Sequence, residues 1–506
     1  MRLNILIGGK AGQGINKISA IISNALSKQG YFTFNYRDYQ SLIRGGHNFN
    51  VLSISDQWIA SHESKIDGLV ALDELTLKLH KLELKPAGFI ITQKGFEDLG
   101  RNLNVALSGA LIKILGLDKK ILLQEVKTQL GDEAAKAIEK GYNSQKTKFS
   151  LKKLNNNITI MSGGQAVSQG AINSNIDRHI AYPMTPATGV LHELSRMQLK
   201  NDNLVVFQPE SEIAAANIAL GVSFAGKRVM VGTSGGGFDL MSETLSLQGM
   251  SEIPLVVYLA SRPGPGTGVP TYTSQADLDI ALRAGHGEFP RIVVAPGDPI
   301  EAIENTNECF YLSEKFGALS IILSDKHLAE SEFSLNKQAN KPLRVDVKRK
   351  LPGKTIVKTS SYEHDIFGCT AEDTKIINQG VQRRLKKYED IKKEVQKFQM
   401  TKLYGKKNSK NLIFAWGSTK GAILDAIKDL DCKFLQVLYL KPLSSEIKKE
   451  IQKAKNVILI ENNVTGQLGR LIREKTGIKI PNRILKYDAR PFRSDELKIQ
   501  IKKMLK

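Results

Sequence analysis

The chain opens with the stretch LNILIGGKAGQGI (residues 3–15). Residues 3–7 are mostly apolar, glycines follow, and apolar residues then recur at helical spacing from Ile15 to Leu26. A strand, a glycine turn and a helix in this order are typical of an open α/β sheet. The turn fits neither phosphate-binding pattern, because Ile15 replaces the P-loop lysine and Lys17 replaces the third glycine of the dinucleotide motif. A tight turn without a ligand and an anion site at the helix N-terminus therefore both stay open.

The same alternation of strands and helices continues along the chain and predicts three units. Residues 1–150, the first unit, carry further strand-like runs, which predict a parallel sheet with covering helices. Residues 158–330, the second unit, repeat the pattern, and so do residues 406–506, the third unit. Residues 331–405 are charged and include a helix candidate at 374–399, which predicts a connector with a solvated helix. The predicted fold class is α/β, with three doubly wound units.

The composition limits the classes of function. At 506 residues, with 41% hydrophobic and 24% charged residues, the chain fits a multidomain globular protein. It has no apolar run long enough for a membrane span, and its start is too short and glycine-rich for a signal peptide, so we expect a cytoplasmic protein without membrane attachment. Three scattered cysteines without a CxxC motif fit a reducing compartment and predict no zinc or iron–sulfur site in this chain.

The formal net charge of +21 has two interpretations that stay open. Lysine and asparagine are plentiful, as in compositional drift of AT-rich genomes. Alternatively, the basic surface docks an acidic electron carrier. Nucleic acid ranks last as a partner, because no binding motif accompanies the charge.

Four motifs of the second unit each follow a predicted strand. They are YPMTP (182–186), QPESEIAAAN (208–217), TSGGGF (233–238) and SRPGPGTG (261–268). Because open α/β sheets bind ligands at the carboxyl ends of their strands, we expect Thr185, Glu212 and Arg262 to meet at one rim of one sheet. Each has an ordinary explanation alone: Glu212 suits a helix dipole, and Arg262 a surface ion pair. Their convergence favours a binding site, in which Arg262 suits recognition of a carboxylate.

A long connection in the first unit also stands out. The segment YRDYQSLIRGGHN (36–48) joins two predicted strands where a short hairpin turn would suffice. Loops of this kind usually carry function. For His47 taken alone, a structural role is the more common one.

Together these motifs resemble the 2-oxoacid:ferredoxin oxidoreductases, in the form in which the gamma and alpha parts are fused in one subunit. The resemblance covers nearly the whole chain. In the gamma part it rests on the turn from Gly12 to Gly14 and on IRGGHN (43–48), and in the alpha part on the four motifs above. GST (417–419) and ENNVTGQL (461–468) resemble the transketolase C-terminal-like domain of this family. The implied units are a gamma domain, a thiamine pyrimidine-binding domain and a transketolase C-terminal-like domain.

The resemblance implies a subunit of an enzyme that oxidatively decarboxylates a 2-oxoacid with coenzyme A and passes the electrons to ferredoxin. Thiamine diphosphate would be shared with a beta subunit, which would supply the Mg²⁺-binding motif and a 4Fe–4S cluster, in a heterodimer or a dimer of heterodimers. The gamma–alpha fusion and residues 264–268 favour 2-oxoglutarate over pyruvate or a branched-chain or aryl 2-oxoacid. A non-catalytic nucleotide-binding module, which the gamma turn alone would permit, is the remaining alternative.

The resemblance also implies roles for individual residues. Glu212 matches the glutamate that hydrogen-bonds the aminopyrimidine ring of the cofactor and favours its imino form. Thr185 and Arg262 match residues that hold the carboxylate and keto group of the substrate. The gamma part would cover the site and help to bind coenzyme A. The further cofactor-binding positions are Tyr182, Pro183, Gly235, Gly12, Gly14, Arg44, Gly45, Gly46, His47 and Asn48, and no metal ligand is expected.

Overall fold

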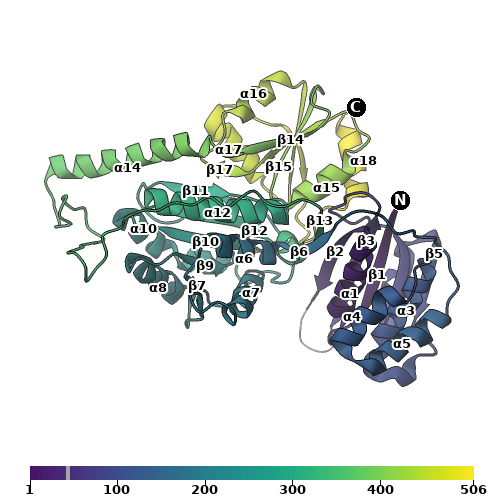
Figure 1. The fold of residues 1–506 in the computed structure, drawn as a ribbon. Coiled ribbons are helices and arrows are strands. Elements are labelled where there is room, and N and C mark those ends of the chain that lie inside the picture. Colours follow the sequence, from purple (N-terminus) through teal and green to yellow (C-terminus); the bar gives the residue numbers. More distant parts are fainter. Residues whose placement is uncertain (41–45, 506) are drawn as a thin grey trace.

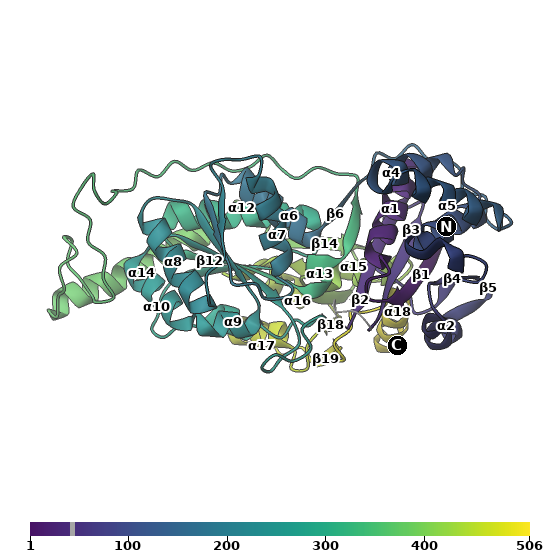
Figure 2. The same ribbon diagram turned by 90° about the horizontal axis from the view of Figure 1, so that it is seen from below.

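Three β-sheets flanked by helices form the structure, a computed structural model that describes residues 1–40 and 46–505 (Figure 1). The first unit (purple to blue) lies at one end, the second unit forms the middle, and the third (yellow-green to yellow) packs on the second. Figure 2 gives the same order, with α14 (Thr374–Val395) at the end opposite to the first unit. Within the described residues, no helix is both long and apolar enough to span a lipid bilayer.

The first sheet has the order β5-β4-β1-β3-β2-β13-β6. Its strands from the first unit are β1 (Arg2–Lys10), β2 (Phe32–Tyr39), β3 (His47–Ser55), β4 (Ile66–Ala71) and β5 (Leu84–Thr92). β1, β4 and β5 are parallel, as predicted, whereas β3 is antiparallel to β1 and β2. The expectation of a parallel sheet is wrong for this pair because residues 40–46, which join β2 to β3, are too few for a crossover connection.

Two further strands of this sheet come from beyond the first unit. β6 (Thr159–Ser162) and β13 (Glu332–Leu335) are antiparallel to each other, and β13 also pairs with β2. The first and second units are therefore joined through one continuous sheet. The helices of the first unit are α1 (Ile15–Lys28), α2 (Glu74–His80), η1 (Lys81–Glu83), η2 (Glu97–Asn102), α3 (Leu103–Ile114), α4 (Lys120–Leu130) and α5 (Asp132–Asn143).

The second sheet has the order β17-β11-β12-β10-β9-β7-β8 and is parallel except for β17. Its strands are β7 (Arg178–Ile180), β8 (Val205–Phe207), β9 (Val229–Thr233), β10 (Leu255–Ser261), β11 (Arg291–Val294), β12 (Leu319–Asp325) and β17 (Tyr439–Lys441). The helices are α6 (Gly163–Asn173), α7 (Thr188–Gln198), α8 (Glu212–Phe224), α9 (Gly235–Leu240), α10 (Ser242–Ser251), α11 (Leu278–Arg283), α12 (Pro299–Phe316) and α13 (Lys326–Glu330).

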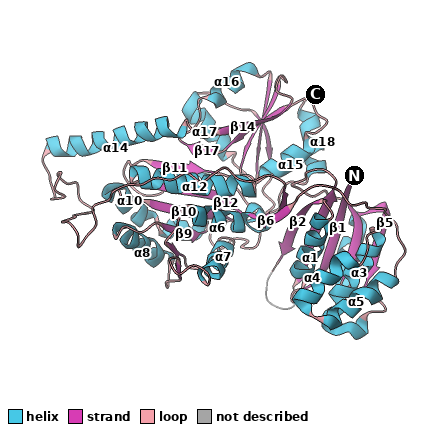
Figure 3. Cartoon of the chain, in the orientation of Figure 1, coloured by secondary structure: helices cyan, strands magenta, loops and turns pink. Residues whose placement is uncertain are grey.

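Helices cover both faces of this second sheet (Figure 3). β10 is buried along its whole length, and its side chains alternate between two cores. Val257 and Leu259 pack toward α8, α10 and α11, while Val256 and Tyr258 pack toward α6, α7 and α12. This two-sided burial is what a doubly wound sheet requires, and it leaves the strand ends as the accessible rims.

The third sheet has the order β14-β16-β15-β18-β19, in which β14 is antiparallel to its neighbour and the other strands are parallel. Its strands are β14 (Thr401–Gly405), β15 (Asn411–Trp416), β16 (Lys433–Val437), β18 (Asn456–Glu461) and β19 (Asn482–Leu485). The helices are α15 (Thr419–Ala426), α16 (Glu446–Lys453), α17 (Gln467–Thr476) and α18 (Ser494–Met504).

The charged helix α14 begins at the predicted residue, Thr374, and ends at Val395. It projects from the body of the molecule (Figure 1). Its solvated character is confined to the projecting part, because Ile391 and Val395 near its end are fully buried in the core of the second unit. The connector therefore ends as an anchored helix.

Candidate functional site

Four of the sequence motifs meet at one rim of the second sheet. The parallel strands β8, β7, β9 and β10 are neighbours in this order, so their carboxyl ends lie side by side. Thr185 follows β7, Glu212 opens the helix after β8, and Arg262 directly follows β10. Gly235 opens the helix after β9. The convergence expected from the sequence is therefore present in the structure.

Arg262 directly contacts the neighbouring strand end. Its Nη1 donates a hydrogen bond to the backbone carbonyl of Thr185, at 2.9 Å. Burial lowers the pKa of the Arg262 guanidinium, whereas the nearby Asp277 and Glu212 carboxylates raise it. The guanidinium thus lies within electrostatic reach of two carboxylates while being held in place by the backbone.

Glu212 is buried at this rim, with 4% of its surface exposed. Ser211 caps α8, because its Oγ accepts a hydrogen bond from the Ala214 amide at 3.2 Å. Oε1 of Glu212 is itself buried and has no hydrogen-bond partner among the described residues. Burying a carboxylate oxygen without a donor is costly, so a position in the helix dipole does not account for Glu212. The free oxygen is available to a donor from outside the chain.

The glycines after β9 let the first turn of α9 approach two carboxylates. A Cβ atom on Gly237 would lie 2.6 Å from Cγ and 2.7 Å from Oε1 of Glu212. A Cβ atom on Gly235 would lie 2.7 Å from Oδ2 of Asp277. A side chain at either position would have to displace these buried carboxylates, and at Gly237 also Thr233 Oγ1, which lies 2.1 Å from the Cβ position, so glycine lets the turn approach them.

Asp277 belongs to this site but was not among the residues expected from the sequence. Burial raises the pKa of its carboxyl to about 6, with Ser261 and Arg262 opposing the rise and Asp239 adding to it. Its Oδ2 is buried without a partner in the described part of the chain. In sequence an aspartate before a helix suggests an ordinary N-cap, yet this side chain makes no cap hydrogen bond with α11. That missing cap becomes visible only in the structure.

Large apolar side chains surround the same strand ends. The exposed ones are Tyr182, Phe207, Ile213 and Leu240, and Pro183 beside them is exposed as well. Tyr182 follows β7, Phe207 ends the neighbouring edge strand β8, and Ile213 lies next to Glu212. An apolar rim around buried polar groups is typical of a surface that another protein covers.

The two motifs of the first unit lie together in a second group. The Ala11 amide donates to the carbonyl of Gly46 at 2.9 Å, which joins the turn from Gly12 to Gly14 to the segment from Gly46 to Asn48. Gly14 has a φ of 72°, and a Cβ atom there would lie 2.6 Å from Asn104 Nδ2. Arg44 and Gly45 lie outside the described residues.

Some of the other polar groups of this second group find partners inside the chain, whereas His47 Nδ1 is buried without a hydrogen-bond partner among the described residues. The side-chain Oε1 of Gln13 accepts a hydrogen bond from the Lys10 amide at 2.7 Å and so closes the turn itself. His47 Nε2 lies 2.9 Å from His80 Nε2, and burial together with His80 lowers the pKa of His47. No hydrogen bond or ion pair among residues 1–40 and 46–505 links this group to Glu212 or Arg262.

The loop that begins at Arg262 leads to a junction of all three units. The Tyr272 ring lies 3.6 Å from the guanidinium carbon of Arg490, and Arg490 Nε lies 3.0 Å from Asp38 Oδ2 in the first unit. Next to it, the His327 amide donates to Thr273 Oγ1 at 3.2 Å. The strand-end site and the first unit are therefore connected through one continuous loop.

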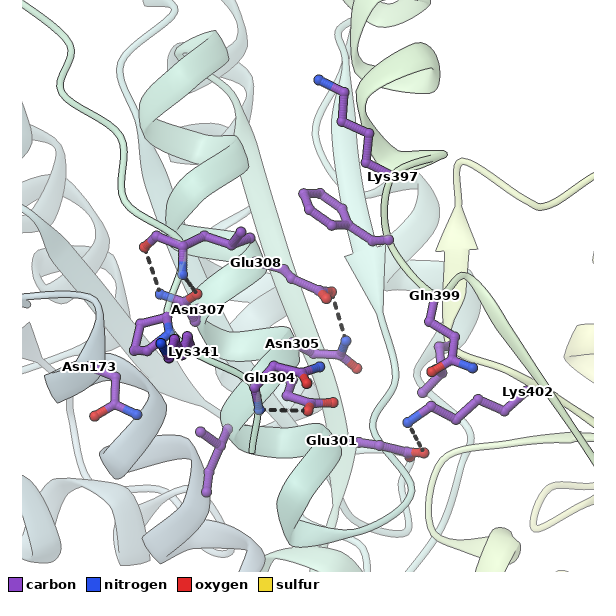
Figure 4. A pocket seen from close by; sticks show the side chains of 16 residues that line it. Asn173, Glu301, Glu304, Asn305, Asn307, Glu308, Lys341, Lys397, Gln399 and Lys402 are labelled. Carbon is purple, nitrogen blue, oxygen red and sulfur yellow. Dashed lines mark hydrogen bonds and ion pairs between the residues drawn. The ribbon is translucent and has the colours of Figure 1, made fainter. Parts of the chain in front are cut away.

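A separate cavity of about 270 Å³ lies along α12, and Figure 4 shows its lining side chains. None of the expected site residues lines it. Its acidic groups are satisfied within the chain: Lys402 pairs with Glu301 at 3.0 Å, and Asn305 donates to Glu308 at 2.9 Å. Burial raises the pKa of Glu308 to about 7. We interpret this network as a polar contact between α12 and β14, the edge strand of the third sheet.

Comparisons with known proteins agree over the whole chain. Residues 169–400 match the family described as pyruvate flavodoxin/ferredoxin oxidoreductase, thiamine diP-bdg, and residues 4–102 match the family described as pyruvate ferredoxin/flavodoxin oxidoreductase. The 2-oxoacid:ferredoxin oxidoreductase subunit alpha of Sulfolobus sp is 30% identical, over 100% of this chain and 97% of the relative. The 2-oxoglutarate oxidoreductase subunit KorA of Mycobacterium tuberculosis is also 30% identical, over 63% of this chain and 52% of the relative.

A solved structure has the same fold. It is that of 2-oxoglutarate:ferredoxin oxidoreductase from Magnetococcus marinus with 2-oxoglutarate, coenzyme A and succinyl-CoA bound. The TM-score is 0.90 with 24% identity, and the match covers 100% of both chains. The three-sheet architecture is therefore shared along its whole length.

Proposed function

Since the chain belongs to the family of 2-oxoacid:ferredoxin oxidoreductase alpha subunits, we propose that its enzyme oxidatively decarboxylates 2-oxoglutarate, forming succinyl-CoA and CO₂ while electrons pass to ferredoxin. The choice of 2-oxoglutarate is supported by the KorA relative, which is named for this substrate, and by the substrate present in the solved structure of the same fold. Pyruvate and branched-chain or aryl 2-oxoacids remain the alternatives.

The observation that carries the proposal is the buried, unpartnered oxygen of Glu212 at a rim where glycines clear the space around it. These features fit the aminopyrimidine half of thiamine diphosphate, which supplies the nucleophilic carbon for attack on a 2-oxoacid when it is bound. In our proposal Glu212 Oε1 accepts a hydrogen bond from that ring and holds its proton in a site shielded from water. Gly235 lets the backbone approach the ring, and Tyr182 and Pro183 flank it.

The substrate head would lie beside Arg262. Its guanidinium suits a carboxylate by charge and by its planar donor geometry, and the bond to the Thr185 carbonyl fixes its direction. In this proposal the Thr185 hydroxyl contacts the keto oxygen of the substrate. In the first unit, the turn at Gly12 and Gly14 and the segment from Gly46 to Asn48, together with Arg44 and Gly45, would contact coenzyme A.

A beta subunit would complete the site. The exposed apolar side chains Tyr182, Phe207, Ile213 and Leu240 surround the strand ends where the cofactor would be shared. The chain has three cysteines, of which Cys309 and Cys432 are buried, so the beta subunit would provide the 4Fe–4S cluster and also the Mg²⁺ site. The complex would be a cytoplasmic heterodimer or a dimer of heterodimers, and the charge of +21 would favour docking of an acidic ferredoxin.

The test is co-expression of the chain with its beta subunit, followed by viologen reduction with a panel of 2-oxoacids. We expect coenzyme A-dependent turnover, with the highest kcat/KM for 2-oxoglutarate, and no turnover by the chain alone. Turnover without the beta subunit would refute the shared site. A higher kcat/KM for pyruvate than for 2-oxoglutarate would make pyruvate the substrate of the enzyme, and the family assignment would stand.

Asp277 should make the KM for 2-oxoglutarate depend on pH. Its carboxyl, with a pKa of about 6, is neutral below that pH and ionised above it, so an added negative charge faces the anionic substrate at higher pH. We therefore expect the KM for 2-oxoglutarate to rise as the pH passes from 5.5 to 7.5. Two neighbouring unit charges exchange about 1 kcal/mol even in water, so the rise should be about fivefold or more.

The variant Asp277→Asn should abolish this rise and give the lower KM throughout. Initial rates over the full range of substrate concentration at each pH provide the measurement. Asp239→Asn is the matched control, because it removes an exposed carboxylate of α9 and should retain the rise in KM, with its midpoint at a lower pH since Asp239 no longer raises the pKa of Asp277. If Asp277→Asn keeps the wild-type profile, the titrating group lies elsewhere.

A further inference from the structure

A cavity lies where α14 packs over the second sheet, away from the rim that carries Glu212. Its volume is about 550 Å³, within the usual range for small-molecule sites. Residues from α14, from the segment before β11 and from β17 line it, among them Phe289, Arg291, Arg384, Leu385, Tyr388 and Lys441. Arg291 is the first residue of β11, so the cavity opens at the amino ends of the parallel strands, opposite to the candidate active site.

Arg291 is a buried cation without a counter-charge. Only 3% of its surface is exposed, its Nε has no partner among the described residues, and its Nη1 reaches the Ala281 carbonyl only at 3.5 Å. The guanidinium carbon lies 4.4 Å from the centre of the Phe289 ring. Burial alone lowers the pKa of Arg291 to about 10, without a contribution from any carboxylate. An unpaired charge in such a place is costly unless a ligand supplies the opposite charge.

Lys441 adds a second cation to the same cavity. It ends β17 next to β11, and its Nζ donates to the Leu282 carbonyl at 3.2 Å. Burial, followed by the charges of Arg291, Lys475 and Arg283, lowers the pKa of Lys441 to about 8. The mutual repulsion of these groups favours an anion between Arg291 and Lys441.

The remaining charged groups around the cavity are paired or exposed. Arg384 pairs with Glu363 at 2.7 Å, and Arg283 pairs with Asp279 at 3.2 Å and also with Glu474. Glu288 lines the cavity but is exposed, and no ion pair joins it to Arg291 or Lys441 within the part of the chain that the structure describes. Two cations without an ion-pair partner in the described part of the chain therefore face the cavity, and the charge of Glu474 offsets that of Lys441 only in part.

The rest of the lining contributes an apolar and aromatic wall. Val381, Leu385 and Tyr388 line the cavity from α14, and Phe289, whose ring stacks against Arg291, lines it as well. Such a wall suits a flat ring, while the paired cations suit a phosphate. From this combination we propose that the cavity binds a nucleoside phosphate, at a site separate from the one where the 2-oxoacid reacts.

The experiment measures binding of ADP, AMP and inorganic phosphate to the full-length chain and to its complex with the beta subunit, by isothermal titration calorimetry. We expect saturable one-to-one binding of ADP, and weaker binding of phosphate alone. Arg291→Met should weaken ADP binding about ten- to a hundredfold, the scale of one lost charge-assisted contact. Lys441→Met should weaken it as well.

Arg383→Met is the matched control, since it removes an arginine of α14 that pairs with Glu252 and does not line the cavity, and it should leave the affinity nearly unchanged. Thermal melting without ligand separates an effect on binding from an effect on folding. Because Arg291→Met removes an unpaired buried charge, the melting temperature of this variant should equal or exceed that of the wild type. A lower melting temperature would instead mark Arg291 as a structural residue.

Three other results would overturn the proposal. They are the absence of ADP binding at millimolar concentration, phosphate binding as tight as that of ADP, and loss of ADP binding in the complex with the beta subunit. The last would mean that the beta subunit fills the cavity. Because these readouts do not depend on turnover, they are independent of the proposed substrate.

Discussion

Replacing Glu212 with glutamine should lower kcat of the assembled enzyme by about two orders of magnitude or more, the scale of a lost acid–base contribution. The glutamine keeps the shape of the buried side chain, but its amide cannot take up and release a proton as a carboxyl group does. Because Oε1 of Glu212 has no internal partner, the substitution breaks no hydrogen bond of that oxygen within the described structure. The subunit should therefore still fold and assemble.

The measurement is the rate of viologen reduction at saturating 2-oxoglutarate, coenzyme A and thiamine diphosphate, with the melting temperature recorded for each variant. Glu210→Gln is the control, because Glu210 is exposed two positions earlier and should keep nearly full activity. Wild-type turnover by Glu212→Gln would contradict the assignment. A large loss in Glu210→Gln alone would move the role to Glu210.

Arg262→Met should lower kcat/KM about ten- to a hundredfold, since one charge-assisted contact is worth about 1.5–3 kcal/mol. The effect should be similar for 2-oxoglutarate and pyruvate, because both present the same 2-oxoacid head. Thr185→Val removes only a hydroxyl and keeps the backbone carbonyl that holds Arg262, so its loss should be smaller. Full substrate-dependence curves for both acids separate changes in KM from changes in kcat.

Arg178→Met is the matched control for this prediction. Arg178 also donates to a backbone carbonyl, that of Asn203 at 2.9 Å, but it begins β7 at the opposite rim of the sheet. The Arg178→Met variant should therefore have the kcat/KM of the wild type. If Arg262→Met impairs only 2-oxoglutarate, Arg262 faces the distal carboxylate, and if it impairs neither acid, the substrate head binds elsewhere.

The strand-end rim could be predicted because its signals are local. Prolines and glycines after each strand fix the turns that present Thr185 and Arg262, and parallel strands bring their carboxyl ends together. Asp277 could not be predicted in this way, because an aspartate before a helix has the same appearance whether or not it caps that helix. Its role depends on Gly235 and Arg262 approaching it in space.

The strand order of the first sheet could be predicted only in part. β1, α1 and β4 follow from local periodicity, but the pairing of β13 with β2 brings together residues that are far apart, such as Asn35 and Glu332, whose separation is 297 positions. No local pattern encodes such a contact. For the same reason, the cavity around Arg291 could not be expected: it forms between α14, β11 and β17, which are distant in sequence.

The contribution of β13 to the first sheet also constrains how the polypeptide is made. A ribosome releases β2, which ends at Tyr39, roughly 300 residues before β13 ends at Leu335. At about 5–20 residues per second, the interval is roughly 15–60 s. During that time the nascent first sheet exposes the backbone hydrogen-bonding groups of β2, a template for aggregation. The order of synthesis therefore leaves this edge of the nascent chain open to wrong pairing until β13 has been made.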